Sequence, residues 1–126
     1  MKSDEKFLDI LSRICEKDKR YKKDAYLFIL FALEKKVKRL KKKRHITGYE
    51  LLQSIRNIAL EQYGMMARTV FESWGVYKTE DFGYMVLNLV EAKIMGKTDT
   101  DSLDDFKHIF DFKQVFEDNF KNWELV

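Results

Sequence analysis

Apolar residues recur along most of the chain every three or four positions, which is the spacing of one face of an α-helix. This pattern predicts five helices, which begin near Ser3, Lys22, Thr47, Met66 and Thr79. The 126 residues include no proline and five glycines, so turn signals are few and a β-sandwich is disfavoured. We therefore expect a mainly α, compact bundle of about five helices, with the whole chain, 1–126, forming a single helical domain.

The second predicted helix has two halves with different surfaces. From Ala25 to Leu33 it is apolar on all sides, so we expect this half to run through the centre of the fold. Beyond Leu33 the apolar positions narrow to one stripe, continued by Val37 and Leu40, and Lys and Arg surround it. The pattern predicts a central strut of about 20 residues, roughly 30 Å long, with a basic end.

The third predicted helix has the clearest boundaries. Thr47 followed three residues later by Glu50 is a capping box, in which each side chain accepts a hydrogen bond from the other residue's backbone amide. Ile46 and Leu51 are placed as a hydrophobic staple across this cap. Gly64 is predicted to close the helix in a left-handed conformation.

A tight turn at Gly75 joins the fourth and fifth predicted helices, so this region resembles a DNA-binding helix-turn-helix motif. A recognition helix needs donors near phosphates, yet the fifth helix begins with Thr79 as predicted cap and two carboxylates. The triplet Asp81-Phe82-Gly83 matches a kinase signature, but the Gly-rich loop and the catalytic loop of kinases are missing. We interpret Asp81 as a helix N-terminal carboxylate, and Gly83 as a position that another backbone segment approaches.

The strongest electrostatic feature is the run from 35 to 44, which holds eight Lys or Arg. Such a run is typical of a solvated helix end, where cations interact favourably with the helix dipole, or of a surface that binds phosphates. No aromatic residue is interleaved within the run, so base stacking is not expected. The candidate polyanion-binding residues are Lys35, Lys38, Arg39, Lys41, Lys42, Lys43 and Arg44.

The segment from 99 to 118 is the acidic counterpart, with seven Asp or Glu against two lysines, although the chain has a formal net charge of +3. The acids either fold onto the basic helix or attract the basic end of a neighbouring copy. Within this segment, Ser102 is placed as a cap for a short turn. Asp111 is placed to cap a last helix that docks through Phe112, Val115, Phe116 and Phe120, and a short β-arm is the alternative. A calcium loop is excluded because Leu103 and Phe110 occupy ligand positions.

Candidate chemistry is sparse. Cys15 is the only cysteine, so no internal disulfide forms and the residue is predicted to be a small buried hydrophobe. Nothing marks His45 and His108 as partners, and His45 is expected in a polar loop. The start of the chain lacks the features of a signal peptide, and the apolar run of nine residues, 25–33, is too short to cross a bilayer. We expect a cytoplasmic, non-membrane protein with no catalytic residue, cofactor or metal site.

Several short stretches together resemble a family of short, conserved, uncharacterised bacterial proteins known largely from planctomycete and verrucomicrobial genomes. The family has no assigned activity, and the resemblance therefore implies no cofactor or catalytic residue. The Lys-rich run departs from the family pattern, and this counts against polyanion binding. The stretches are Arg20-Tyr21, Asp24-Ala25-Tyr26, Phe28, His45-Ile46-Thr47-Gly48, Glu50-Leu51-Leu52, Gln62-Tyr63-Gly64, Met66-Ala67, Trp74-Gly75, Thr79 to Gly83, Asp105-Phe106, Phe110 and Phe112.

These observations favour a non-catalytic interaction module that binds a protein partner or a second copy of itself. Segregated charge and the aromatic residues Tyr77 and Trp123, which we expect to be exposed, support this hypothesis. The alternative is binding of nucleic acid or another polyanion through the basic end of the second helix.

Overall fold

The computed structural model describes residues 2–42, 44–96 and 103–118, and within these ranges every regular element is helical. The predicted mainly α bundle is therefore confirmed, and the described part of the C-terminal segment forms short helical turns instead of a β-arm. The predicted cap Ser102 and the predicted docking residue Phe120 lie outside the described residues. The elements are α1 (Lys2–Lys17), α2 (Lys23–Arg39), α3 (Gly48–Tyr63), the 3₁₀ turn η1 (Gly64–Met66), α4 (Ala67–Ser73), α5 (Thr79–Glu91), the 3₁₀ turn η2 (Leu103–Phe106) and the π-helical turn η3 (Gln114–Asp118).

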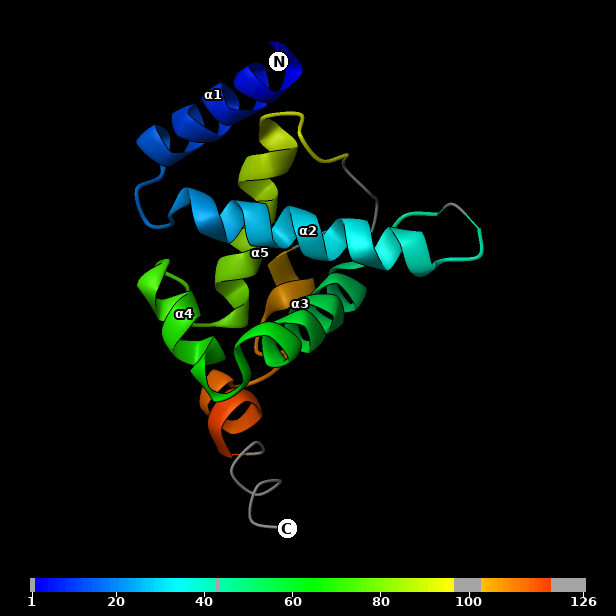
Figure 1. Ribbon diagram of the computed structural model, residues 1–126, viewed down its shortest axis with the longest axis vertical. Helices are drawn as coiled ribbons and strands as arrows, with labels where there is room; N and C mark the ends of the chain where they lie inside the picture. The colour runs from blue at the N-terminus through cyan, green and yellow to red at the C-terminus, as the bar shows by residue number, and fades with distance from the viewer. Residues whose placement is uncertain (1, 43, 97–102, 119–126) are drawn as a thin grey trace.

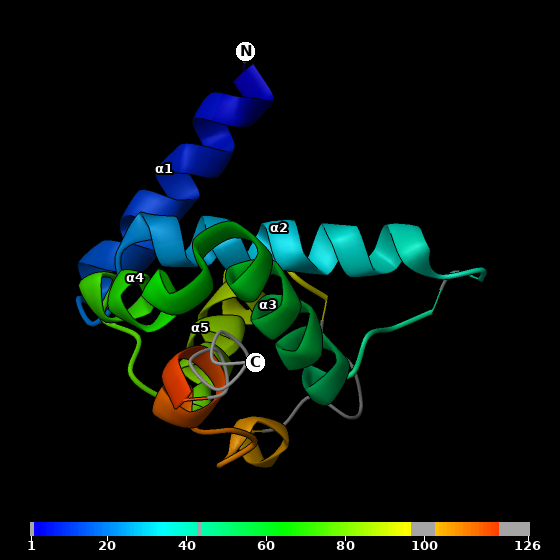
Figure 2. The ribbon, with the colours of Figure 1, turned by 60° about the horizontal axis from the view of Figure 1, so that its bottom comes forward.

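Helix α2 crosses the middle of the molecule, with α1 on one side and α3 on the other (Figure 1). Its C-terminal part and the connection to α3 extend beyond the other helices in both views (Figure 2). The strut is thus in the predicted place, but its apolar half is not buried on all sides. Leu27 and Phe31 are 39% and 41% exposed, because α1 and α3 cover only part of the helix circumference.

An aromatic cluster forms the centre of the core around Phe71 of α4. Phe71 is fully buried, and four phenylalanine rings lie with their centroids 5.3 to 5.6 Å from it. Aromatic pairs at this separation add to the free energy of burial. The cluster joins α2, α4, α5 and the C-terminal segment through Phe28, Phe82, Phe112 and Phe116.

The capping box of α3 is present as predicted. The Glu50 amide donates to Thr47 Oγ1 at 3.1 Å, and the Thr47 amide donates to Glu50 Oε1 at 3.2 Å. At the other end Gly64 does have a positive φ of 53°, but its ψ of −128° differs from the predicted left-handed cap. The reason is that the chain continues directly into η1 there.

Two predicted caps are wrong. Helix α1 begins at Lys2, so Ser3 lies inside it. At α5 the cap position belongs to Lys78, because the Thr79 hydroxyl is used elsewhere: it donates to the Phe106 carbonyl at 2.6 Å. The carboxylate of Asp81 instead accepts the amide of Lys78 at 3.2 Å and that of the preceding residue, which confirms its role at the helix N-terminus.

The packing of Phe106 of η2 accounts for the glycines at two positions of the helices beneath it. Its side chain is buried, and a Cβ atom placed at Gly48 of α3 or at Gly83 of α5 would lie about 2.9 to 3.0 Å from that side chain. The close approach predicted at Gly83 is therefore real, but a side chain makes it and not a backbone segment. This contact holds η2 against both helices.

Candidate anion-binding site

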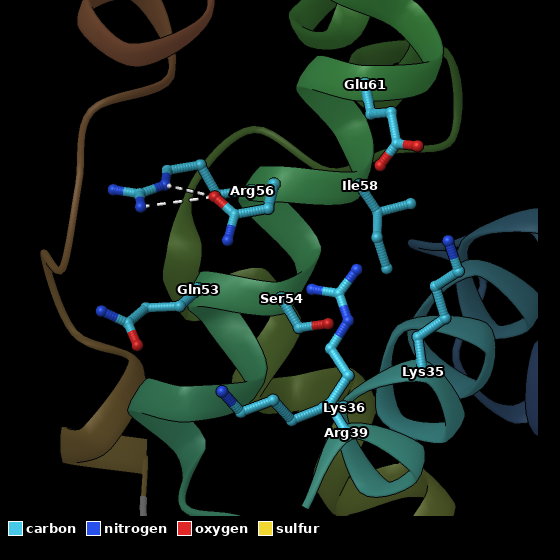
Figure 3. Close-up of a pocket in the computed structure, with 9 residues that line it drawn as sticks. Lys35, Lys36, Arg39, Gln53, Ser54, Arg56, Ile58 and Glu61 are labelled. Atoms are coloured by element: carbon cyan, nitrogen blue, oxygen red, sulfur yellow. Dashed lines mark hydrogen bonds between the residues drawn. The ribbon is translucent and has the colours of Figure 1, made fainter.

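The C-terminal half of α2 lies beside α3, and a hollow of about 160 Å³ opens between them (Figure 3). The two helices are held together beneath it by Ser54, whose buried hydroxyl donates to the carbonyl of Ala32 at 2.8 Å. This bond satisfies a polar group that would otherwise be buried without a partner. The base of the hollow is thus formed by two packed helices that are joined by a buried hydrogen bond.

The side chains around the hollow are mainly basic and polar. Four carry a positive charge and one carries a negative charge, so the lining has an excess of positive charge. The cations are Lys35, Lys36 and Arg39 of α2 and Arg56 of α3, and the single carboxylate is that of Glu61. The remaining residues of the lining are Gln53, Ser54, Asn57 and Ile58.

Helical spacing explains why three cations of α2 meet here. Residues three and four positions apart lie on one helix face, so Lys35 and Lys36 are near Arg39. In Figure 3 the Arg39 side chain passes beside Ser54, while the Lys36 side chain extends across the N-terminal turns of α3. All three lie in the last turns of α2, where the helix dipole favours positive charge.

The cations of the hollow are not paired with a carboxylate in the part of the chain that the structure describes. Among the described residues, Lys35, Lys36, Arg39 and Arg56 form no ion pair with a carboxylate. The Arg56 guanidinium makes two long hydrogen bonds of 3.4 Å to the Asn57 side chain, which direct it away from α2. The positive charge of the hollow is thus available to an anion from solution.

The predicted polyanion-binding residues separate into three groups. Lys35 and Arg39 line the hollow. Two others are already paired: Lys38 Nζ lies 2.9 Å from Glu34 of the same helix, and Arg44 forms a two-bond pair with Glu50 at 2.7 and 2.9 Å. The remaining members of the set follow the end of α2: Lys41 and Lys42 are exposed, and Lys43 lies outside the described residues.

Two cations of the hollow, Lys36 and Arg56, are missing from the predicted set. Lys36 belongs to the basic run, but its sequence neighbours did not distinguish it from the other lysines of the run as a residue that binds anions. Arg56 lies 17 residues beyond Arg39 on the polar face of another helix. The short connection between the two helices could have indicated Arg56. A short connection makes consecutive helices antiparallel neighbours and so brings their polar faces together.

Two acids of the C-terminal segment, Asp111 and Glu117, make contacts away from the basic helix. Glu117 of η3 pairs with Arg68 of α4 at 3.3 Å, and Asp111 accepts the Gln114 amide at 3.0 Å, which confirms it as a cap. Glu117 therefore does not pair with the basic helix α2, as the prediction that the acidic end folds onto that helix would require. This pair instead anchors η3 beside the aromatic core.

Other sites offer less. A hollow between α1 and α5 has mixed charge, with Arg13 and Lys17 facing Asp18 and Glu91. Cys15 is only partly buried, not fully buried as predicted, and this partial burial raises the pKa of its thiol, which disfavours the reactive thiolate. No group of three or more His, Cys, Asp or Glu side chains is arranged to hold a metal ion in the part of the chain that the structure describes.

The fold and the site define a small all-α domain with a positively charged hollow between two antiparallel helices. Comparison with protein-family models, with curated proteins and with solved structures finds no match for the chain. The resemblance to a bacterial family therefore stays a prediction. No helix among the described residues is long and apolar enough to cross a membrane.

Proposed function

We propose that this protein is a non-catalytic, cytoplasmic binding domain that holds nucleic acid through its phosphates, using the hollow between α2 and α3. The main support for the proposal is that Lys35, Lys36 and Arg39 line one hollow and that none of them is paired with a carboxylate among the described residues. Exposed lysines continue along the connection to α3 at Lys41 and Lys42. Lys and Arg side chains of this kind neutralise the phosphates of a nucleic acid.

Charge density and geometry both support this proposal. Cations whose charge is not compensated release condensed counter-ions from a nucleic acid when they bind it, and this release is the main source of non-specific affinity. The hollow lies between the C-terminal half of α2 and α3, and the end of α2 next to it extends beyond the other helices in both views. Glu61 reduces the local charge but leaves an excess of positive charge in the lining.

The proposal is tested by fluorescence anisotropy with random-sequence DNA and RNA oligonucleotides, titrated between about 50 and 200 mM salt. We expect affinity that falls steeply as salt rises. The triple variant Lys35→Gln, Lys36→Gln, Arg39→Gln should bind more weakly, and its log–log salt slope should be smaller by about 1 for each cation removed.

The matched control removes the same charge elsewhere, in the exposed residues Lys78, Lys107 and Lys113, each changed to Gln. If both triple variants lose affinity equally, the effect comes from net charge and the hollow is not the site. Negligible binding by the unchanged protein at low salt would end the proposal.

A second candidate function is binding of a protein partner or of a second copy, favoured by the exposure of Tyr77. Its side chain is 62% exposed, whereas large aromatic side chains usually bury more of their surface. The other proposed contact, Trp123, lies outside the described residues. Crosslinking under native conditions tests this candidate, which fails if Tyr77→Ser leaves every crosslinked product unchanged.

A further inference from the structure

Two exposed apolar residues of α2, Leu27 and Phe31, lie on the same helix face as two cations of the hollow, Lys35 and Arg39. Leu27, Phe31, Lys35 and Arg39 are separated by steps of four residues, so they form one stripe along the helix. From Leu27 to Arg39 this stripe is about 18 Å long at the rise of an α-helix. One surface strip thus changes from apolar to cationic along its length.

The apolar end of this stripe forms an open aromatic hollow with α3 and α4. Its lining includes Leu27, Phe28 and Phe31 of α2, Tyr63 of α3 and Trp74, which directly follows α4. The rings of Tyr63 and Trp74 are half-buried and lie 6.2 Å apart, and both pack on the buried ring of Phe28. Phe31 is the most exposed of these rings.

The aromatic hollow and the cationic hollow are neighbours. The Lys35 ammonium lies 5.6 Å from the centre of the Phe31 ring, near the outer limit of a cation–π contact. On α3, Glu61 lines the cationic hollow and the next residue, Gln62, lines the aromatic one. An extended ligand can therefore occupy both hollows at once along the surface of the two helices.

We propose that this surface binds single-stranded nucleic acid, with an unpaired base stacked on Phe31 in the aromatic hollow and the adjoining phosphates held by Lys35 and Arg39. The inference rests on the proposed function and adds the class of nucleic acid. Sites for single strands combine a basic track for the backbone with aromatic side chains for the bases, and both are present here side by side. Lys35 has a flexible stem, so its ammonium can turn from the Phe31 ring to a phosphate.

A duplex fits this arrangement poorly. Its bases are paired and stacked on one another, so Phe31 would remain exposed while only the cations made contacts. The acids of α2 do not oppose a single strand at the cationic end, and Glu61 of α3, which lines the cationic hollow, leaves it an excess of positive charge. Glu34 is paired with Lys38, and Asp24 lies about 10 Å before Phe31 on the helix, at the far end from the cations.

The experiment compares three DNA probes of one length on the full chain: a thymine oligonucleotide, the same oligonucleotide without bases, and a duplex. We expect the thymine strand to bind at least about tenfold more tightly than the abasic strand. Phe31→Leu, which keeps an apolar side chain but removes the ring, should weaken binding of the thymine strand by about 5- to 100-fold and leave the abasic strand unchanged.

Two further measurements sharpen the test. Tyr77→Leu removes an exposed aromatic ring outside this surface and should leave all three affinities unchanged. In the variant Trp123→Phe the only tryptophan is Trp74, and its fluorescence should be quenched by the thymine strand but not by the abasic strand. Far-UV circular dichroism and urea unfolding establish that each variant is folded.

The outcomes separate this inference from the function on which it rests. Equal affinity for the thymine and abasic strands, or an equal effect of Phe31→Leu on both, overturns base stacking. Duplex binding as tight as single-strand binding also overturns it. In all these cases, weaker binding by the triple cationic variant would still support nucleic-acid binding. Failure to bind any probe at low salt would remove both proposals.

Discussion

Gly75 shows how a single residue determines the path of the chain between α4 and α5. Its φ of 89° lies in the region that L side chains rarely adopt, and a Cβ there would overlap the carbonyl oxygen of Arg20. The close approach also allows the Lys22 amide to donate to the Trp74 carbonyl at 3.1 Å. The turn that resembled a DNA-reading motif is thus a contact with the connection between α1 and α2.

We expect Gly75→Ala to destabilise the fold by about 1–3 kcal/mol, because the substitution adds backbone strain and a steric overlap. Urea unfolding measures the change in the free energy of unfolding. Gly96→Ala is the matched control, since a Cβ at Gly96 meets no atom within 4 Å. Equal unfolding midpoints for the two variants would contradict the role assigned to Gly75.

At the scale of an element, α3 is fixed at its start by charge as well as by its capping box. The carboxylate of Glu50 accepts two hydrogen bonds from Arg44 and one from the Thr47 amide. Chiefly through the Arg44 bonds, the pKa of Glu50 is lowered to about 2 from its ordinary 4.5. Arg44, predicted to bind polyanions, is therefore used to order the connection that leads into α3.

The lowered pKa of Glu50 predicts a dependence of stability on pH. Its contribution is complete above about pH 4.5, where the unfolded chain is also ionised, and is lost as pH falls toward 2. Glu50→Gln should therefore destabilise the protein by about 0.5–1 kcal/mol at pH 7, a modest value because solvent screens the half-exposed Arg44 of the pair. The difference from the unchanged protein should shrink below pH 4.5.

Urea midpoints measured from pH 7 down to about pH 3 test this dependence. Glu16→Gln, which changes an exposed acid of α1, is the control and should show a smaller effect at pH 7. A penalty for Glu50→Gln that stays constant over this range would assign the effect to packing and not to charge.

At the scale of the whole molecule, the aromatic core joins the C-terminal segment to the rest of the bundle. Phe116 of η3 is fully buried, and its ring centre lies 5.5 Å from that of Phe71 and 5.4 Å from that of Phe112. The pair of Arg68 and Glu117 lies beside this contact. The segment from 103 to 118 is therefore packed into the same core as the helices that precede it, and we expect it to unfold together with them.

Phe116→Ala should lower the free energy of unfolding by about 3–5 kcal/mol, since it opens a cavity beside Phe71. Near-UV and far-UV circular dichroism should follow one shared transition at a lower midpoint. Substitution of the neighbouring exposed Lys113 by Ala is the control. Early loss of the near-UV signal, with the helical signal unchanged, would show that η3 unfolds independently of the bundle.

Local pattern was sufficient to predict most of the helices. Apolar spacing, the Thr47 and Glu50 pair, and glycines after helix ends depend on interactions within a few residues, and these predictions agree with α2, α3, α4 and α5 to within a few positions. The cap at Thr79 failed because a contact distant in sequence, with Phe106, competed for its hydroxyl. Nothing near Thr79 in the sequence indicates that contact.

The candidate site could be predicted only in part, because its two components depend on different information. A positive end to α2 follows from the sequence alone, since charge belongs to each residue wherever the helix lies. Which side of α2 remains exposed, and whether Phe31 and Trp74 border one hollow, depends on how α1, α3 and α4 pack around it. The aromatic residues near the basic end cannot be found within the basic run itself: Phe31 lies one helical turn from Lys35, and folding adds Trp74 to the same surface.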